Sequence, residues 1–268
     1  RGLAPVLYPC FDVPEYESSF RIMEQATAID KALDVLFHVH AQHEPQRVSE
    51  IGRALGLPKS SAHRLLAALR RRALVEQDEA GRYRTGAGLL GLALGVLDRE
   101  PLVAAARSTL EHQAASLGET FFLVSARGGR LIVLDKVEGT GLLRVSPQVG
   151  SAVPAHASAV GKLYLAHAPE LVTLPRPLPR YTPHTITSLP ALTKQVQAVA
   201  AQGHALSRGE WIDGLTVVAA PLFRSERMLG AVCVALAASG KSGLDERRAI
   251  AGAEQAATAI SARLGGER

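Results

Sequence analysis

Apolar residues recur at three- and four-residue intervals from Thr27 onward, which is the period of a helix with one buried face. Thr27 and Asp30 have the spacing of a capping box, in which each side chain bonds to a free N–H group of the helix start. We therefore predict a helix that begins here. Its inward positions are Ile29, Ala32 or Leu33, Leu36 and Val39.

A second, short helix is predicted after Ser49, whose hydroxyl is a favourable N-cap. Its inward residues would be Ile51, Ala54 and Leu55. It should end at Gly56-Leu57-Pro58, because proline disfavours helical geometry in the residue before it.

A third helix is predicted over residues 59–72, with Ala62, Leu65, Leu66 and Leu69 facing inward. At about 100° per residue, the opposite face then carries Ser60, Arg64, Ala67 and Arg71, flanked by Ser61 and His63. The following segment LVEQDEAGRYRT predicts two short strands around an acidic glycine turn. A short helix, a tight turn, a polar second helix and such a wing are typical of a winged helix-turn-helix.

The segment GLLGLALGVL at residues 88–97 is apolar on every side. A helix without a polar face must be covered all round. We expect it to pack between subunits or against the other parts of its own chain.

The second half mixes helices with strands. A helix is predicted from Pro101 to Leu117, ended by Gly118 in the C-cap role. Strands are expected at 120–126, 131–138, 142–146, 204–207, 216–223 and 228–237, with helices at 156–168, 191–202 and 245–264. This order predicts an α+β domain over an antiparallel sheet.

The basic charge of the chain is concentrated in its first half. Between residues 46 and 86 there are nine basic and four acidic residues, and this excess equals the net charge of +5 of all 268 residues. Together with the helix-turn-helix pattern, it predicts binding to double-stranded DNA. An ordinary solvated face is the alternative for the charge run alone.

The expected DNA contacts divide by chemistry. Arg64 can bond a guanine in bidentate fashion or clamp a phosphate, and serines near the helix start are short enough to reach phosphates or base edges. Lys59, Arg82 and Arg84 should hold the DNA backbone. The full set of predicted contacts is Ser49, Lys59, Ser60, Ser61, His63, Arg64, Arg82 and Arg84.

Other features of the composition restrict the function further. The two cysteines, Cys10 and Cys233, are far apart and form no CxxC pair, so neither a disulfide framework nor a zinc site is expected. No apolar run approaches the length of a membrane span, and the first residues lack the core of a signal peptide. We expect a cytoplasmic protein without metal or cofactor.

In several of its segments, the chain resembles the isocitrate lyase regulator (IclR) family of bacterial transcriptional regulators. RVSEIGRALGLPKSSAHRLLAALRRRALVE carries the resemblance in the first half. GETFFLV, VLDKVEGTGLLRVSPQVGSAVPAHASAVGKLYLA, YTPHTIT and QGHALSRGEWIDGLTVVAAPLF follow in the order found in the family. The similarity covers about residues 27–264.

The resemblance implies a winged helix-turn-helix joined by a helical linker to a GAF-like α/β effector-binding domain with an antiparallel sheet. The corresponding ranges are an N-terminal arm (1–26), the DNA-binding domain (27–87), the linker helix (88–100) and the effector-binding and oligomerisation domain (101–268). It also implies a homodimer or dimer of dimers on an operator with two-fold character, and more often repression than activation.

The resemblance further implies a pocket for a small, usually carboxylate-bearing effector. Backbone N–H groups of Ala159 and Val160 at a helix start would hold the anion, which suits the partial positive charge of that end. The other matching positions are Leu142, Val145, Ser207, Leu215, Val217, Cys233 and Ala235. Ser207, Cys233 and Ala235 stand where members that bind small oxo-acids carry acidic or hydroxyl groups, so we expect a more apolar or aromatic ligand. Core packing is the alternative for each.

Two other classes are less well supported by the sequence. An enzyme with an accessory DNA-binding head would need a catalytic signature. A phosphate-binding loop requires glycine where His156 stands and a hydroxyl residue where Leu163 stands, and neither GxSxG nor HExxH occurs. An architectural DNA-binding protein without a ligand would not need the long, charge-balanced second half.

Overall fold

The structure is a computed structural model that describes the chain apart from residues 1–26, 43, 98, 142–146, 238–245 and 266–268. The described chain divides into two compact units, Arg1–Arg99 and Glu100–Arg268. The N-terminal arm and the strand predicted at 142–146 lie outside the described residues. The finer division into four domains stays a prediction.

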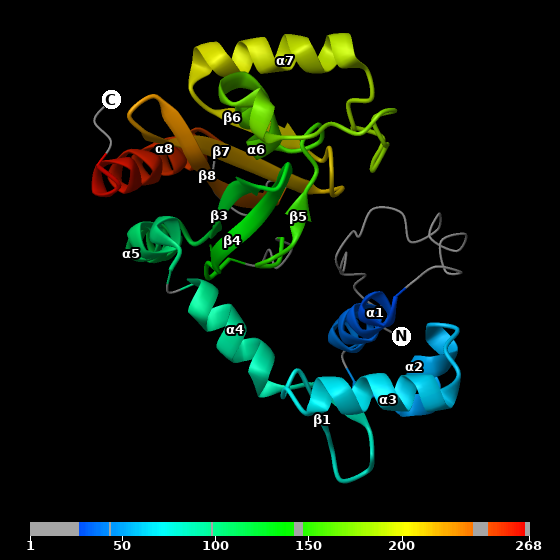
Figure 1. Ribbon diagram of the computed structural model, residues 1–268. Helices are drawn as coiled ribbons and strands as arrows, with labels where there is room; N and C mark the ends of the chain where they lie inside the picture. Colours follow the sequence, from blue (N-terminus) through cyan, green and yellow to red (C-terminus); the bar gives the residue numbers. More distant parts are fainter. Residues whose placement is uncertain (1–26, 43, 98, 142–146, 238–245, 266–268) are drawn as a thin grey trace, which may run out of the picture. The chain divides into compact units, whose positions relative to one another are not determined.

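The first unit is a winged helix-turn-helix (Figure 1), as predicted. It contains α1 (Ala28–Ala41), α2 (Val48–Ala54), α3 (Lys59–Arg70), β1 (Val75–Gln77), β2 (Tyr83–Thr85) and α4 (Ala87–Leu97). The capping box of Thr27 and Asp30 is present, and β1 pairs antiparallel with β2. A small core, centred on Val35, Ile51 and Leu66, joins the helices to the wing.

Several local predictions for this unit are wrong. Ser49 is not the cap of α2, because the helix begins at Val48 and the Glu50 carboxylate accepts the Arg47 N–H at 2.6 Å instead. α3 ends at Arg70, two residues early. Ala54 is exposed, as are Ile29 and Leu33 on α1, whose buried face is formed by Val35 and Val39. Of the predicted inward positions, Val39 is buried and Leu36 packs against the core, whereas Ile29 and Leu33 were wrongly assigned because the apolar residues of α1 lie on more than one face.

The second unit is a six-stranded antiparallel sheet with helices on both faces (Figure 1). The strand order is β5-β4-β3-β8-β7-β6, and each adjacent pair is antiparallel, as expected. The strands are β3 (Thr120–Arg127), β4 (Arg130–Val137), β5 (Ala152–Val153), β6 (Ala205–Arg208), β7 (Leu215–Arg224) and β8 (Arg227–Ala237). The short strand β5 was not predicted.

Helices form a separate core on each face of the sheet. α5 (Pro101–Leu117) and α8 (Glu246–Arg263) cover one face, and α6 (Ala159–His167) and α7 (Leu189–Gln202) lie over the other. Gly118 ends α5 in the left-handed conformation, as predicted. α6 begins three residues later than predicted, since Ser158 is its N-cap and accepts the Gly161 N–H at 3.1 Å.

Candidate functional site

The surface of α3 presents the residues predicted to meet DNA. Lys59, Ser60, His63 and Arg64 are exposed, and Ser61 is half-buried. The opposite face of the helix is fixed in the core by buried Ala62, Leu66 and Leu69. Because that packing determines which residues point outward, the predicted helix phase is confirmed, except that Ala67 is partly buried.

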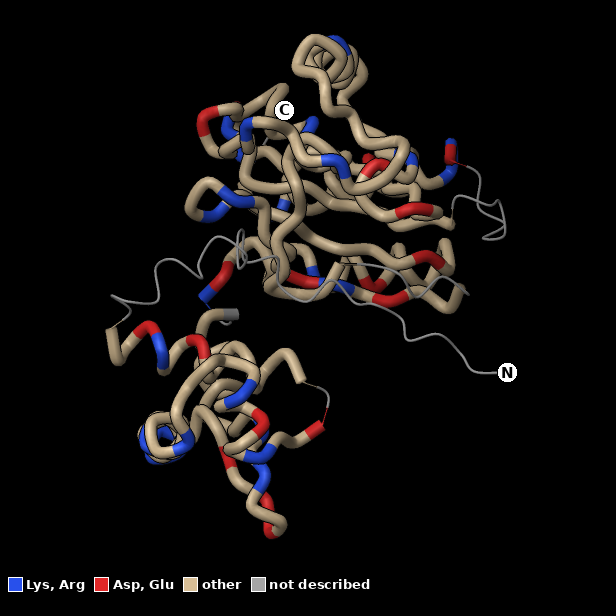
Figure 2. The backbone as a smooth tube through the Cα atoms, turned by 90° about the vertical axis from the view of Figure 1, so that its right-hand side faces the viewer, with Lys and Arg blue, Asp and Glu red and all other residues tan. Residues whose placement is uncertain are grey.

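Part of the positive charge on α3 and the wing is not neutralised by ion pairs. Among the described residues, Lys59, Arg64 and Arg82 take part in no ion pair, so their charges remain available to phosphates. Arg84 differs, because its Nε lies 2.6 Å from Glu76 Oε1 across the wing. Figure 2 shows basic residues along this unit and acidic residues at the turn of the wing. The charge of Arg84 is therefore partly neutralised by Glu76, whereas Ser49 is exposed on α2 and does not cap that helix.

The second candidate site is a small cavity of about 20 Å³ inside the second unit, between the sheet and the start of α6. It has room for about one water molecule. Of the predicted effector residues, the structure brings Ala159, Val160, Ser207, Leu215 and Val217 to its wall. The sequence reasoning missed the remaining wall residues, which are Phe122, Pro147, Val153, Ala157, Ser158, Trp211 and Ile212.

The other predicted effector residues are placed differently. Cys233 and Ala235 are fully buried on β8 and do not line the cavity. They are cross-strand neighbours of Phe122 and Val217, which do. Burial also raises the pKa of the Cys233 thiol, which keeps it an uncharged core group. Leu142 and Val145 lie outside the described residues.

The cavity has one place suited to an anion. Ser158 caps α6, and the next N–H groups, those of Ala159 and Val160, have no partner inside a helix that begins here. The partial positive charge of the helix end adds to their effect. Close packing holds this turn in place, because a Cβ on Gly161 would overlap the carbonyl oxygen of Ala155.

The rest of the wall is almost entirely apolar. The hydroxyl groups of Ser158 and Ser207 are used within the protein, donating to Pro154 O at 2.6 Å and to Ala157 O at 3.3 Å. No charged side chain lines the cavity among the described residues. His156, which precedes α6, is fully buried and bonds through Nε2 to Pro179 O at 2.8 Å. The described wall residues can receive one acceptor group and an apolar body, and none of their side chains is an acid or base.

The described residues also bear on membrane and metal-binding classes of function. In the part of the chain that the structure describes, every helix is too short or too polar to cross a lipid bilayer. Within the same residues, no group of three or more His, Cys, Asp or Glu side chains is arranged to hold a metal ion.

Comparison with known proteins identifies both units. Residues 28–79 match the IclR helix-turn-helix domain, and residues 94–262 match the C-terminal domain of the bacterial transcriptional regulator IclR. These matches extend over most of the chain. Both domains occur in transcriptional regulators rather than enzymes.

Individual relatives and structures agree. The probable transcriptional regulator SauR of Cupriavidus necator is 31% identical over 212 residues, covering 77% of this chain and 83% of SauR. The repressor AllR of Salmonella paratyphi A is 28% identical over 235 residues, 85% of either chain. An IclR homologue from Microbacterium hydrocarbonoxydans, crystallised with 4-hydroxybenzoate, has a TM-score of 0.75 at 23% identity, over 89% of this chain and 99% of its own.

Proposed function

Because the chain belongs to the IclR family of bacterial transcriptional regulators, we propose that it represses a catabolic operon and responds to a small monocarboxylate with an apolar or aromatic body. The observation that carries the ligand class is the cavity wall, where free helix N–H groups face apolar side chains. An operator on the chromosome would place the protein in the cytoplasm.

Because no charged side chain lines the described wall, a ligand with one carboxylate is favoured over a ligand with two. A single carboxylate can accept the N–H groups of Ala159 and Val160. A second carboxylate would be buried against side chains such as Phe122 and Leu215, and the described wall residues include no cation to meet it, so its burial is costly. Repression is the proposed direction because AllR, a relative over most of its length, is a repressor.

The size of the cavity adds a condition. Pockets for organic ligands measure roughly 300–1,000 Å³, whereas this one measures about 20 Å³. The wall must therefore open when a ligand enters. The Microbacterium homologue was crystallised with 4-hydroxybenzoate, and this compound joins benzoate and short oxo-acids in the panel to be tested.

Calorimetry over that panel is the direct test. Aromatic monocarboxylates should bind more tightly than glyoxylate, and benzamide should bind poorly because it lacks the charge. Val160→Asp should abolish the response by placing a carboxylate at the anion site, while Leu189→Asp, on the exposed start of α7, should leave it intact. If only glyoxylate-sized acids bind wild-type protein, the proposed ligand class is wrong, whatever the stability of Val160→Asp.

Binding to DNA and assembly complete the proposal. We assign the operator contacts to α3 and the wing, with Arg64 reading a base and Lys59 and Arg82 holding phosphates. A second copy of the chain is proposed to cover α4, which would match an operator with two-fold character.

The case for the second copy rests on α4 itself. Leu90, Leu92, Leu94 and Val96 are 50–68% exposed. Gly91 and Gly95 lie one turn apart on this helix, and a Cβ on either would meet nothing within 4 Å. Glycine in a helix destabilises it by about 1 kcal/mol relative to alanine, so an apolar helix with two glycines gains from a partner that packs closely against it.

A further inference from the structure

The loop between β6 and β7 forms part of the cavity wall. Its residues Trp211 and Ile212 line the cavity, although they belong to no helix or strand. Glycines in the left-handed conformation stand at its ends, Gly209 with φ +65° and Gly214 with φ +73°. The Gly209 N–H donates to Leu215 O at 2.8 Å and closes the base of the loop.

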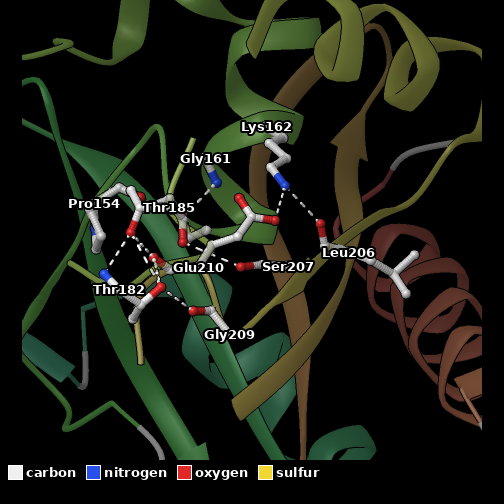
Figure 3. Close-up of polar contacts among 11 residues, drawn as sticks. Pro154, Gly161, Lys162, Thr182, Thr185, Leu206, Ser207, Gly209 and Glu210 are labelled. Carbon is white, nitrogen blue, oxygen red and sulfur yellow. Dashed lines mark hydrogen bonds and ion pairs between the residues drawn. The ribbon is translucent and has the colours of Figure 1, made fainter. Parts of the chain in front are cut away.

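Between the first glycine and the tryptophan stands Glu210, which does not line the cavity and whose carboxylate reaches Lys162 in a polar cluster (Figure 3). Its Oε1 lies 2.5 Å from Lys162 Nζ, which also donates to Leu206 O at 3.0 Å. The side chains of Lys162 and Glu210 are only 1% and 9% exposed. Desolvation by burial lowers the pKa of Lys162, and the neighbouring carboxylate opposes this shift.

The backbone of the same loop is held from another side. Thr182 Oγ1 donates to Gly209 O at 2.6 Å, and Thr185 Oγ1 donates to Glu210 O at 2.6 Å. Both threonines are buried. The segment that contains Glu210 is therefore fixed through its side chain and its carbonyl groups, while Trp211 next to it is only partly buried.

The ion pair connects two sides of the cavity. Lys162 belongs to α6 and lies within one turn of Ala159 and Val160, whose N–H groups form the proposed anion site. Glu210 directly precedes the loop residues that close the cavity. A buried ion pair generally gives less stability than a well-packed apolar pair, although it can fix a unique arrangement. The pair of Lys162 and Glu210 can therefore fix the orientation of the loop against α6.

We propose that Lys162 and Glu210 are positioning residues, which hold the loop 209–214 closed over the effector cavity, and that a ligand enters when this loop turns about Gly209 and Gly214. The proposal rests on the proposed function in one respect, namely that the cavity receives a ligand. It explains how a wall enclosing about 20 Å³ can admit an organic acid.

Trp211 allows a direct test, because it is the single tryptophan of the chain. Quenching of its fluorescence by acrylamide should be at least twofold stronger in Glu210→Gln and in Lys162→Met than in wild type. Glu246→Gln is the matched control, since it breaks the exposed ion pair of Arg208 with Glu246 without touching the cavity. Equal quenching in wild type and Glu210→Gln overturns the proposal.

Stopped-flow mixing with sodium benzoate, followed at Trp211, measures the entry step. We expect the association rate constant to rise about tenfold in Glu210→Gln, because a loosened loop opens more often. A purely structural role would lower the bound amplitude without raising the rate. Benzoate binding with no change in Trp211 emission or quenching would show that another part of the wall opens, which also overturns the proposal.

A double variant protects the test from misfolding. Lys162→Met with Glu210→Gln leaves no buried charge unpaired, so it should fold even where a single variant does not. Quenching of Trp211 in this double variant should remain stronger than in wild type. Quenching equal to that of wild type contradicts the proposal that the ion pair holds the loop closed. If the variants change quenching but no acid of the panel binds wild-type protein, the proposed ligand fails while the positioning role stands.

Discussion

In the unit Arg1–Arg99 the residues expected to meet DNA are mostly exposed side chains on α2, α3 and the wing. The wall of the cavity in Glu100–Arg268 is instead largely buried, and it comes from separate strands, a loop and a helix start. The expected DNA surface offers Lys59, Arg64 and Arg82, which form no ion pair among the described residues, and Arg84, which pairs with Glu76. The cavity uses backbone N–H groups, and its serine hydroxyls are already bonded. A surface site can therefore be changed one side chain at a time, while the cavity depends on packing throughout its unit.

The largest expected effect concerns assembly. Leu94→Glu on α4 would bury a carboxylate in the proposed interface, and a dimer should become a monomer with at least 100-fold weaker binding to a two-fold operator. Light scattering at micromolar concentration measures the assembly, with Leu189→Glu in the other unit as the control. Wild-type protein that is already monomeric would contradict the interface.

The second prediction compares helix glycines in the two units. Gly161→Ala should lower the free energy of unfolding by about 3 kcal/mol, because the new Cβ overlaps the Ala155 carbonyl oxygen in a packed interior. Gly95→Ala meets no atom within its own chain and should instead favour the helix. Urea denaturation measures both. If Gly95→Ala weakens the dimer while strengthening the isolated helix, close packing of two α4 helices is supported.

The third prediction tests the exposed face of α3. Arg64→Ala should weaken operator binding by roughly 1–3 kcal/mol if the side chain reads a base, without affecting assembly or ligand binding. A gel-shift titration measures it, and Arg248→Ala on the surface of α8 removes an equal charge elsewhere. Unchanged operator affinity in Arg64→Ala removes this residue from the contacts.

The smallest effect concerns the wing. Glu76→Gln frees Arg84 from an exposed ion pair whose partners lie 2.6 Å apart. Since exposed pairs contribute about 0.2–1 kcal/mol, operator affinity should rise by no more than that amount. Fluorescence anisotropy at several salt concentrations detects the change. Glu79→Gln, also exposed in the wing turn, removes the same charge without freeing Arg84, and an equal gain there would point to general repulsion.

Features that depend on residues close together in the chain could be predicted from the sequence. The capping box at Thr27, the outward face of α3, the wing and the end of α5 at Gly118 were all predicted, because each depends on residues within a few positions of one another. The family resemblance supplied Ala159, Val160, Ser207, Leu215 and Val217, which the fold brings to one wall. Their role in ligand binding stays a prediction.

What the sequence could not supply was set by packing between distant segments. The buried side of α1 excludes Ile29 because α3 and the wing meet it at Val35 and Val39. Trp211 joins the cavity wall and Glu210 meets Lys162, 48 positions away, only after β6 and α6 pack together. Local hydrogen bonds and hydrophobic periodicity depend on residues close together in the chain, so the sequence by itself determines them. A cavity or a buried ion pair depends on which surfaces the whole fold brings into contact, and the tertiary structure alone decides that.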